Sequence, residues 1–141
     1  MGRLSDAVHA IDVRRLAQTE ESARVKQRLL HPESGGPADI AVTLIRTPPG
    51  DGSPAGLHQH PYDQVFHLIE GTMTVEVDGD VGEVSAPSLI HFPAHTPHRN
   101  WNASSSPTLH LSIAAPAPRP GQQKTIALQR DSFGNSAVGE A

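Results

Sequence analysis

The chain has 141 residues, which is enough for about one domain with a single hydrophobic core. Its formal net charge of −4 and its pI near 6.1 argue against a nucleic-acid-binding surface, and no apolar run is long enough to span a membrane. The absence of cysteine excludes disulfides and thiolate metal ligands. Because no apolar signal region is present at its start, the chain is expected in the cytoplasm.

Short elements separated by turns dominate the sequence, which contains 12 glycines and 13 prolines. In chain order, the β-branched and alternating segments predict about nine strands. They are Val25–Leu30, Ile40–Ile45, Leu57–His60, Gln64–Ile69, Thr72–Val77, Val81–Val84, Leu89–Phe92, His98–Trp101 and Thr108–Ile113. The sequence Asp78-Gly79-Asp80 predicts a tight hairpin after the fifth of these. Since no crossover helices separate the strands, the fold class is all-β, a sandwich or a barrel.

The ends of the chain are predicted to be less regular than this core of about residues 25–115. Residues 1–24 form an N-terminal arm, in which Leu4–Leu16 could hold a helical turn. Residues 116–141 form a Pro-rich linker and a partly disordered tail, in which Thr125–Leu128 could add an edge strand. The whole chain is therefore predicted to be one domain with two short terminal arms.

Histidine is the most informative residue type, because seven of the nine histidines fall between His58 and His110. His58 and His60 lie two apart on a predicted strand, so both imidazoles point to the same face. Imidazole binds several first-row divalent metals, and His98 on a later strand can supply a third ring. The pattern indicates a metal site.

Two spaced motifs surround these histidines. The first reads Gly, five residues, His58-x-His60, three residues, Gln64, six residues, Gly71. The second contains Pro93, His98 and Asn102. Together they resemble the two motifs of the cupins, G-x5-H-x-H-x3-E-x6-G and G-x5-P-x-G-x2-H-x3-N, over about residues 41–114. Gln64 replaces the glutamate of the first motif, while Pro87 and His95 replace the two glycines of the second.

The resemblance implies a single cupin jelly-roll β-barrel that holds one divalent transition metal, namely zinc, nickel, iron or manganese. Its ligands would be His58, His60, Gln64 and His98, of which Gln64 and His98 are also the candidate catalytic residues. It further implies a small-molecule substrate and a homodimer, with no nucleic-acid or membrane partner. Candidate residues for the substrate pocket, which would suit an apolar or aromatic substrate, are Tyr62, Phe66, Leu68 and Trp101.

Gln64 bears most directly on the reaction, because a neutral amide leaves the full divalent charge on the metal. A set of three histidines and a glutamine resembles that of cupins with non-redox chemistry on enols and carbonyls, such as polyketide cyclases. This favours isomerisation or cyclisation by proton transfer. Two alternatives stay open, a quercetinase-like dioxygenase and a non-enzymatic small-molecule-binding cupin.

The other histidines are predicted to lie outside the ligand set. His67 is three residues from Gln64, so a regular strand turns it away from the metal. His91 and His95 are expected at the surface or around the ligands. On the last predicted strand the apolar Leu109, Leu111 and Ile113 share one face, which places His110 on the other, outside the pocket.

Overall fold

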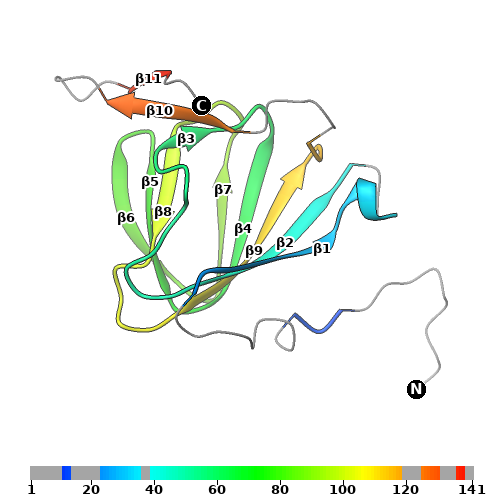
Figure 1. Ribbon diagram of the computed structural model, residues 1–141. Coiled ribbons are helices and arrows are strands. Elements are labelled where there is room, and N and C mark those ends of the chain that lie inside the picture. Colours follow the sequence, from blue (N-terminus) through cyan, green and yellow to red (C-terminus); the bar gives the residue numbers. More distant parts are fainter. Residues whose placement is uncertain (1–10, 14–22, 36–38, 119–124, 131–135, 139–141) are drawn as a thin grey trace.

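The computed structural model describes residues 11–13, 23–35, 39–118, 125–130 and 136–138 (Figure 1). Its elements are β1 (Val25–Leu30), the 3-10 helix η1 (Pro32–Ser34), β2 (Ala41–Thr47), β3 (His58–Gln59), β4 (Asp63–Glu70), β5 (Thr72–Val77), β6 (Asp80–Ser85), β7 (Ser88–Phe92), β8 (His98–Trp101), β9 (Thr108–Ala115), β10 (Ile126–Arg130) and β11 (Ser136–Val138). The predicted all-β class is confirmed. Most of Leu4–Leu16, where a helical turn is predicted, lies outside the described residues.

All nine predicted strands are present, and β1, β5 and β8 have the predicted bounds. The predicted hairpin joins β5 to β6, where Asp78 and Gly79 have φ values of 50° and 89° and Val77 pairs with Asp80. Both turn residues adopt the left-handed conformation that a two-residue hairpin needs. The tail contains two strands, β10 and β11, rather than one. Across the described ranges, no helix has the length and apolar character that a membrane crossing requires.

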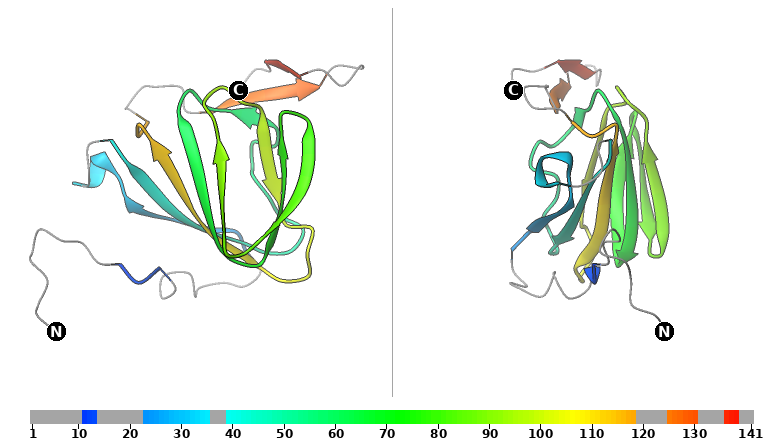
Figure 2. Two further views of the ribbon diagram at one scale, coloured as in Figure 1. Left: turned by 180° about the vertical axis from the view of Figure 1, so that it is seen from behind. Right: turned by 90° about the vertical axis from the view of Figure 1, so that its right-hand side faces the viewer.

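The strands form two antiparallel sheets. The first has five strands in the order β1-β2-β9-β4-β7, and the second has six in the order β11-β10-β3-β8-β5-β6. Within the second sheet, β3 and β10 lie at one end of the molecule, whereas β5 and β6 form its side (Figure 1). Strand β1 lies at one edge of the five-stranded sheet, as both views of Figure 2 make clear.

The apolar core fills one end of the space between the sheets. Its buried members are Phe66 and Leu68 of β4, Met73 and Val75 of β5, and Ile90 and Phe92 of β7. These residues come from facing strands of the two sheets, so their burial holds the sheets together. The other end, between β1, β2 and β9 on one side and β3 and β8 on the other, remains open for a site.

Strand β9 corrects one prediction. Its interior face carries His110, Ser112 and Ala114, all buried, whereas Leu111 and Ile113 are only half-buried. The prediction placed His110 on the face away from the pocket, and this was wrong. The leucines instead join a second apolar cluster on the outer face of the sheet, where Leu44 and Leu109 pack with Val13, Leu29, Ile69 and Leu111. Because both faces of β9 are covered, apolar residues do not identify its interior face.

Both glycines of the first motif occupy positions where a side chain does not fit. A Cβ on Gly52 would lie 2.6 Å from the carbonyl oxygen of Asn100, because the loop of Gly52 pairs with Trp101 of β8. Gly71 has a φ of +88°, and its Cβ would lie 2.6 Å from the carbonyl oxygen of Pro107. Close backbone approach and left-handed conformation are the two situations that require glycine.

Gly71→Ala is therefore expected to destabilise the protein strongly. Left-handed backbone strain and the contact with Pro107 together cost about 2–4 kcal/mol of the free energy of unfolding. Gly82→Ala is the matched control, because Gly82 lies on β6 and a Cβ there meets nothing within 4 Å. The control is expected to stay within about 0.5 kcal/mol of the wild type in urea unfolding. Equal stabilities of the two variants would contradict this account of Gly71.

Candidate metal centre

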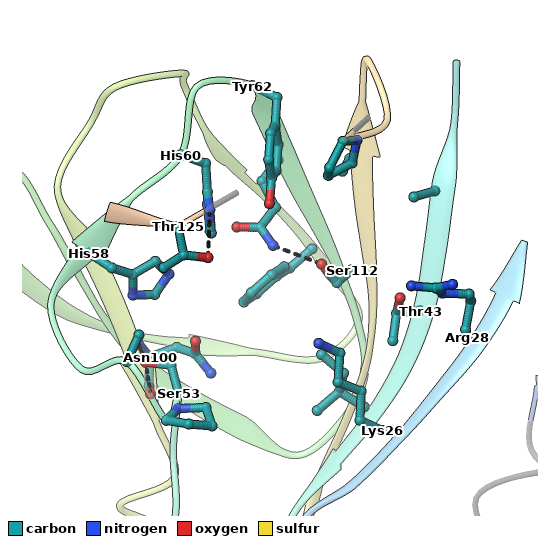
Figure 3. A pocket seen from close by; sticks show the side chains of 18 of the residues that line it. Lys26, Arg28, Thr43, Ser53, His58, His60, Tyr62, Asn100, Ser112 and Thr125 are labelled. Atoms are coloured by element: carbon teal, nitrogen blue, oxygen red, sulfur yellow. Dashed lines mark hydrogen bonds between the residues drawn. The ribbon is translucent and has the colours of Figure 1, made fainter. Parts of the chain in front are cut away.

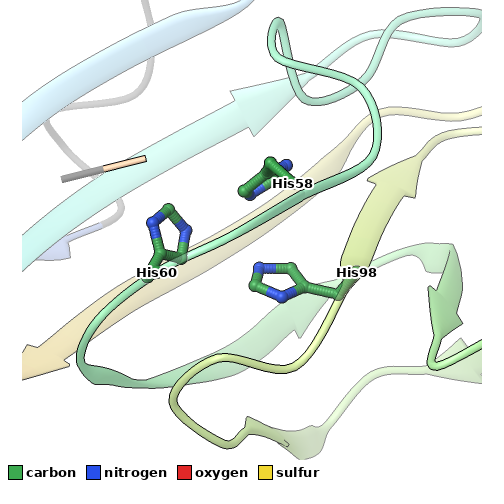
Figure 4. Close-up of side chains that lie close together, drawn as sticks. All are labelled: His58, His60 and His98. Atoms are coloured by element: carbon green, nitrogen blue, oxygen red, sulfur yellow. The ribbon is translucent and has the colours of Figure 1, made fainter. Parts of the chain in front are cut away.

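His58, His60 and His98 meet in the interior, as Figure 4 shows. His58 of β3 and His98 of β8 lie directly opposite each other in the antiparallel pairing of these strands. His60 is two residues beyond His58, so its ring points to the same side. All three side chains are buried, and one ring nitrogen from each lies within 4.8 Å of the others. Three imidazoles in this arrangement could bind one divalent metal ion.

Backbone hydrogen bonds orient two of the rings. His58 Nδ1 donates to the carbonyl oxygen of Gly56 at 2.6 Å, and His98 Nδ1 donates to that of Thr96 at 2.9 Å. A carbonyl only accepts, so the proton lies on Nδ1 and Nε2 keeps its lone pair. His98 Nε2 is buried and has no hydrogen-bond partner within the described part of the chain. This is the tautomer and orientation of a metal-binding histidine.

Burial favours the neutral form of two of the rings, His98 and His58. The pKa of His98 is lowered to about 4, chiefly by desolvation and also by the neighbouring His58 and His60, against the opposing effect of the Thr96 carbonyl. Desolvation also lowers the pKa of His58. Neutral imidazole is the form that binds metal, so the site is prepared for a metal at neutral pH.

Gln64 of β4 brings its amide to the same cavity. Its Nε2 donates to Ser112 Oγ of β9 at 2.8 Å, which directs the amide group (Figure 3). Its Oε1 is buried and lacks a hydrogen-bond partner among the described residues. A buried carbonyl oxygen without a partner is costly unless something binds it. The residues present therefore fit a metal ion, with His98 Nε2 and Gln64 Oε1 both left for it.

A cavity of about 460 Å³ opens beside this cluster. His58, His60 and Gln64 line it, and so do two of the four predicted pocket residues, Tyr62 and Phe66. The other two do not. Leu68 is fully buried in the apolar core, and the ring of Trp101 lies under the guanidinium of Arg99 at 4.7 Å. Alternation explains Trp101, because His98 and Asn100 take the interior positions of β8.

Tyr62 stacks on His60, with the ring centroids 4.8 Å apart and an interplanar angle of 14°. Burial raises the pKa of its hydroxyl to about 12, so the phenol keeps its proton at neutral pH. Pro61 precedes Tyr62 and interrupts the strand, so alternation does not fix the direction of this side chain. In the structure, Tyr62 offers a hydroxyl to a molecule in the cavity.

The remaining histidines take other positions. His67 alternates with the buried Phe66 and Leu68 and lies on the outer face of β4, as predicted. His91 is exposed, and its Nε2 lies 3.6 Å from Asp63 Oδ1. His110 is fully buried against Phe66. Its pKa is lowered to about 3, mainly by burial and in smaller part by the positive charge of Arg24. It is thus an interior residue outside the group of three.

The second motif holds the loops around the site. His95 has a φ of 61°, the left-handed conformation that explains the usual glycine there, and its N–H donates to the carbonyl of His60 at 2.7 Å. Asn102 is fully buried and its amide nitrogen donates to the carbonyls of Thr47 and Ser106. The bond from His95 to His60 joins the two motifs directly, and the two bonds of the Asn102 amide anchor the loop after β8.

Sequence reasoning missed several residues of the cavity. Ser112 was not predicted, because the sequence pattern of β9 indicated the opposite face as the interior one. Arg24, Lys26 and Arg28 also line the cavity, and the available signal was their spacing of two, which begins just before the expected strand Val25–Leu30. Asn100, which lies between His98 and Asn102, and Thr125, whose Oγ1 is 3.4 Å from His60 Nδ1, complete the polar lining relevant here.

Comparisons with known proteins agree with this architecture. The curated protein named "Polyketide synthase CurC" from Streptomyces cyaneus is 27% identical over 121 residues, which cover 83% of this chain and 77% of that protein. The solved structure of TT1209 from Thermus thermophilus is 26% identical, covers 79% of this chain and 100% of that one, and has a TM-score of 0.67.

An RmlC-like cupin with a double-stranded β-helix fold from Methanocaldococcus jannaschii has a TM-score of 0.63 at 17% identity, covering 83% of this chain and 95% of that one. Its similarity shows the shared fold. Residues 43–114 match the family described as "Cupin domain". Because this match spans more than half of a chain that has the same fold, with the histidines of both motifs brought together inside it, the chain belongs to the cupin family.

Proposed function

We propose that this cupin is a metal-dependent enzyme that moves a proton on an enol or carbonyl substrate without redox chemistry, as in isomerisation or cyclisation. The observation that carries the proposal is the donor set. It consists of three imidazoles and the amide oxygen of Gln64, which is buried and has no partner in the described chain. None of these donors carries a charge. A divalent ion held by them would keep its charge and act as a Lewis acid on a substrate oxygen.

The residues of the chain have separate roles in this proposal. His58, His60 and Gln64 line the cavity and would hold the ion there. His98, which is 1% exposed and bonded to Thr96 through Nδ1, would supply the third imidazole. Ser112 fixes the Gln64 amide so that its oxygen is presented. Tyr62 would donate a hydrogen bond to the substrate oxygen, because its phenol stays protonated.

The similarity to the protein named "Polyketide synthase CurC" supports a substrate with enol or carbonyl groups. The cavity volume of about 460 Å³ is that of a small-molecule site. Tyr62 and Phe66 give part of its lining an apolar aromatic character. The homodimer and the cytoplasmic location stay predictions.

Oxygen dependence tests the proposal. The protein is stripped of metal, rebuilt separately with zinc and with iron, and assayed without oxygen on a panel of enols and β-dicarbonyl compounds. Ultraviolet absorbance of the enol and deuterium uptake from D₂O report proton transfer. Turnover by the zinc form above the metal-free protein is expected, because a Lewis acid needs no change of oxidation state. Activity only of the iron form in air, with oxygen consumed in step with substrate, would overturn the proposal in favour of a dioxygenase.

A further inference from the structure

A row of cationic side chains faces the cavity from β1. Arg24 precedes this strand, and Lys26 and Arg28 lie on it at a spacing of two, so alternation places them on one face. Lys26 is paired with Ile45 of β2, and Arg28 with Thr43. Both of these β2 residues line the cavity, as do all three cations. The interior face of the edge strand is therefore a basic wall.

This wall contrasts with the chain as a whole. The formal net charge is −4, yet the cavity lining contains no Asp or Glu among the residues that the structure describes. Two carboxylates of the described residues interact with the wall from outside this lining. Glu33 is 3.7 Å from Arg28, with both side chains more than 40% exposed, and Asp51 attracts Arg24 electrostatically. An exposed ion pair at this distance contributes little and exchanges readily for another anion.

Arg24 adds a second observation. It is partly buried, and its Nε is buried without a hydrogen-bond partner within the described part of the chain. A buried guanidinium N–H that lacks an acceptor is unfavourable, and an acceptor supplied by a ligand would satisfy it. Lys26 and Arg28 lie nearer the solvent and would guide an anion inward.

The cationic wall and the histidines occupy different sides of the cavity. Figure 3 shows Lys26 and Arg28 across it from His58 and His60. In the five-stranded sheet, two strands, β2 and β9, separate β1 from the Gln64 strand β4. A molecule that fills the cavity would thus meet neutral metal-binding groups at one end and positive charge at the other.

We propose that the substrate is an anion, with a carboxylate at the end distant from its enol or carbonyl group, and that Arg24, Lys26 and Arg28 bind this carboxylate. The inference rests on the proposed function for the other end of the molecule. Arginine matches the two oxygens of a carboxylate with paired N–H donors, and lysine adds a point charge. The three side chains therefore determine which enols are accepted and in which orientation.

The test uses 4,6-dioxoheptanoate, a β-diketone with a carboxylate at its far end, and its uncharged methyl ester. Isothermal titration calorimetry of the zinc-loaded protein is expected to give at least about tenfold tighter binding of the acid. Lys26→Gln combined with Arg28→Gln should weaken this preference, Arg24→Gln added to them should remove it, and both variants should leave the affinity for the ester unchanged. Arg46→Gln is the matched control, since Arg46 lies on β2 but does not line the cavity, and it should preserve the preference.

Two further measurements make the result decisive. Raising the salt concentration on the wild-type protein should weaken the acid more than the ester, which checks the charge effect without any substitution. Repeating the titrations on metal-free protein separates the two proposals, because the preference for the acid should persist there even if the metal contributes nothing. Equal affinities for acid and ester, or no detectable binding of the acid, would overturn the inference.

Discussion

Replacing His98 by alanine is expected to abolish stoichiometric metal binding and to remove the stabilisation that the metal gives the wild-type fold. His98 supplies a buried Nε2 with no other partner in the described chain, so no neighbouring group replaces it. Metal at about a thousand times its dissociation constant adds about 4 kcal/mol to the free energy of unfolding. For a chain of this size, that corresponds to a melting temperature higher by on the order of 10 °C.

Elemental analysis after dialysis measures the metal content, and thermal melts with and without a chelator measure the stabilisation. The chelator should lower the melting temperature of the wild type, whereas the melting temperatures of His98→Ala and His58→Ala should not change on chelation. His91→Ala is the control, because this exposed histidine lies outside the group of three and should leave both readouts unchanged. A full equivalent of metal retained by His98→Ala would show that the ligand set is wrong.

Gln64→Glu is expected to keep the metal and to lose turnover, on the order of 100-fold. The exchange preserves the length and shape of the side chain, and Ser112 Oγ can donate to the new carboxylate in place of accepting from the amide. The added negative charge lowers the effective charge of the ion and weakens its action on a substrate oxygen. Turnover is measured on the enol that the wild-type zinc form converts, together with metal content.

Gln59→Glu is the matched control for this change. Gln59 lies between His58 and His60 on β3, so it carries the same substitution on the opposite face of the strand. It should leave turnover and metal content near the wild-type values. Undiminished turnover in Gln64→Glu would rule out a charge-dependent role for the amide, and loss of metal would indicate that the carboxylate distorts the site.

Much of the site could be predicted because it depends on local geometry. The spacing of His58 and His60 on a strand predicts that their side chains point to the same face, and the structure places both rings on one side. The motif glycines Gly52 and Gly71 lie where a Cβ has no room, so their spacing reflects backbone contacts that this chain makes in the folded state. The Asp78-Gly79 turn likewise adopts the conformation that its residues favour.

The sequence by itself determined the all-β class, the strand positions and the shared direction of His58 and His60, because these follow from period-two alternation and turn chemistry. The resemblance of its two motifs to the cupins added His98 to this pair. Only the tertiary structure decided which face of each strand points inward. On β9, Leu111 faces an outer apolar cluster, while Ser112 reaches Gln64 inside. On β1, the packing of the strand against the rest of the sheet likewise places Lys26 and Arg28 toward the cavity. Alternation groups residues by face, but packing against a second layer selects the interior one, and that choice depends on strands distant in the sequence.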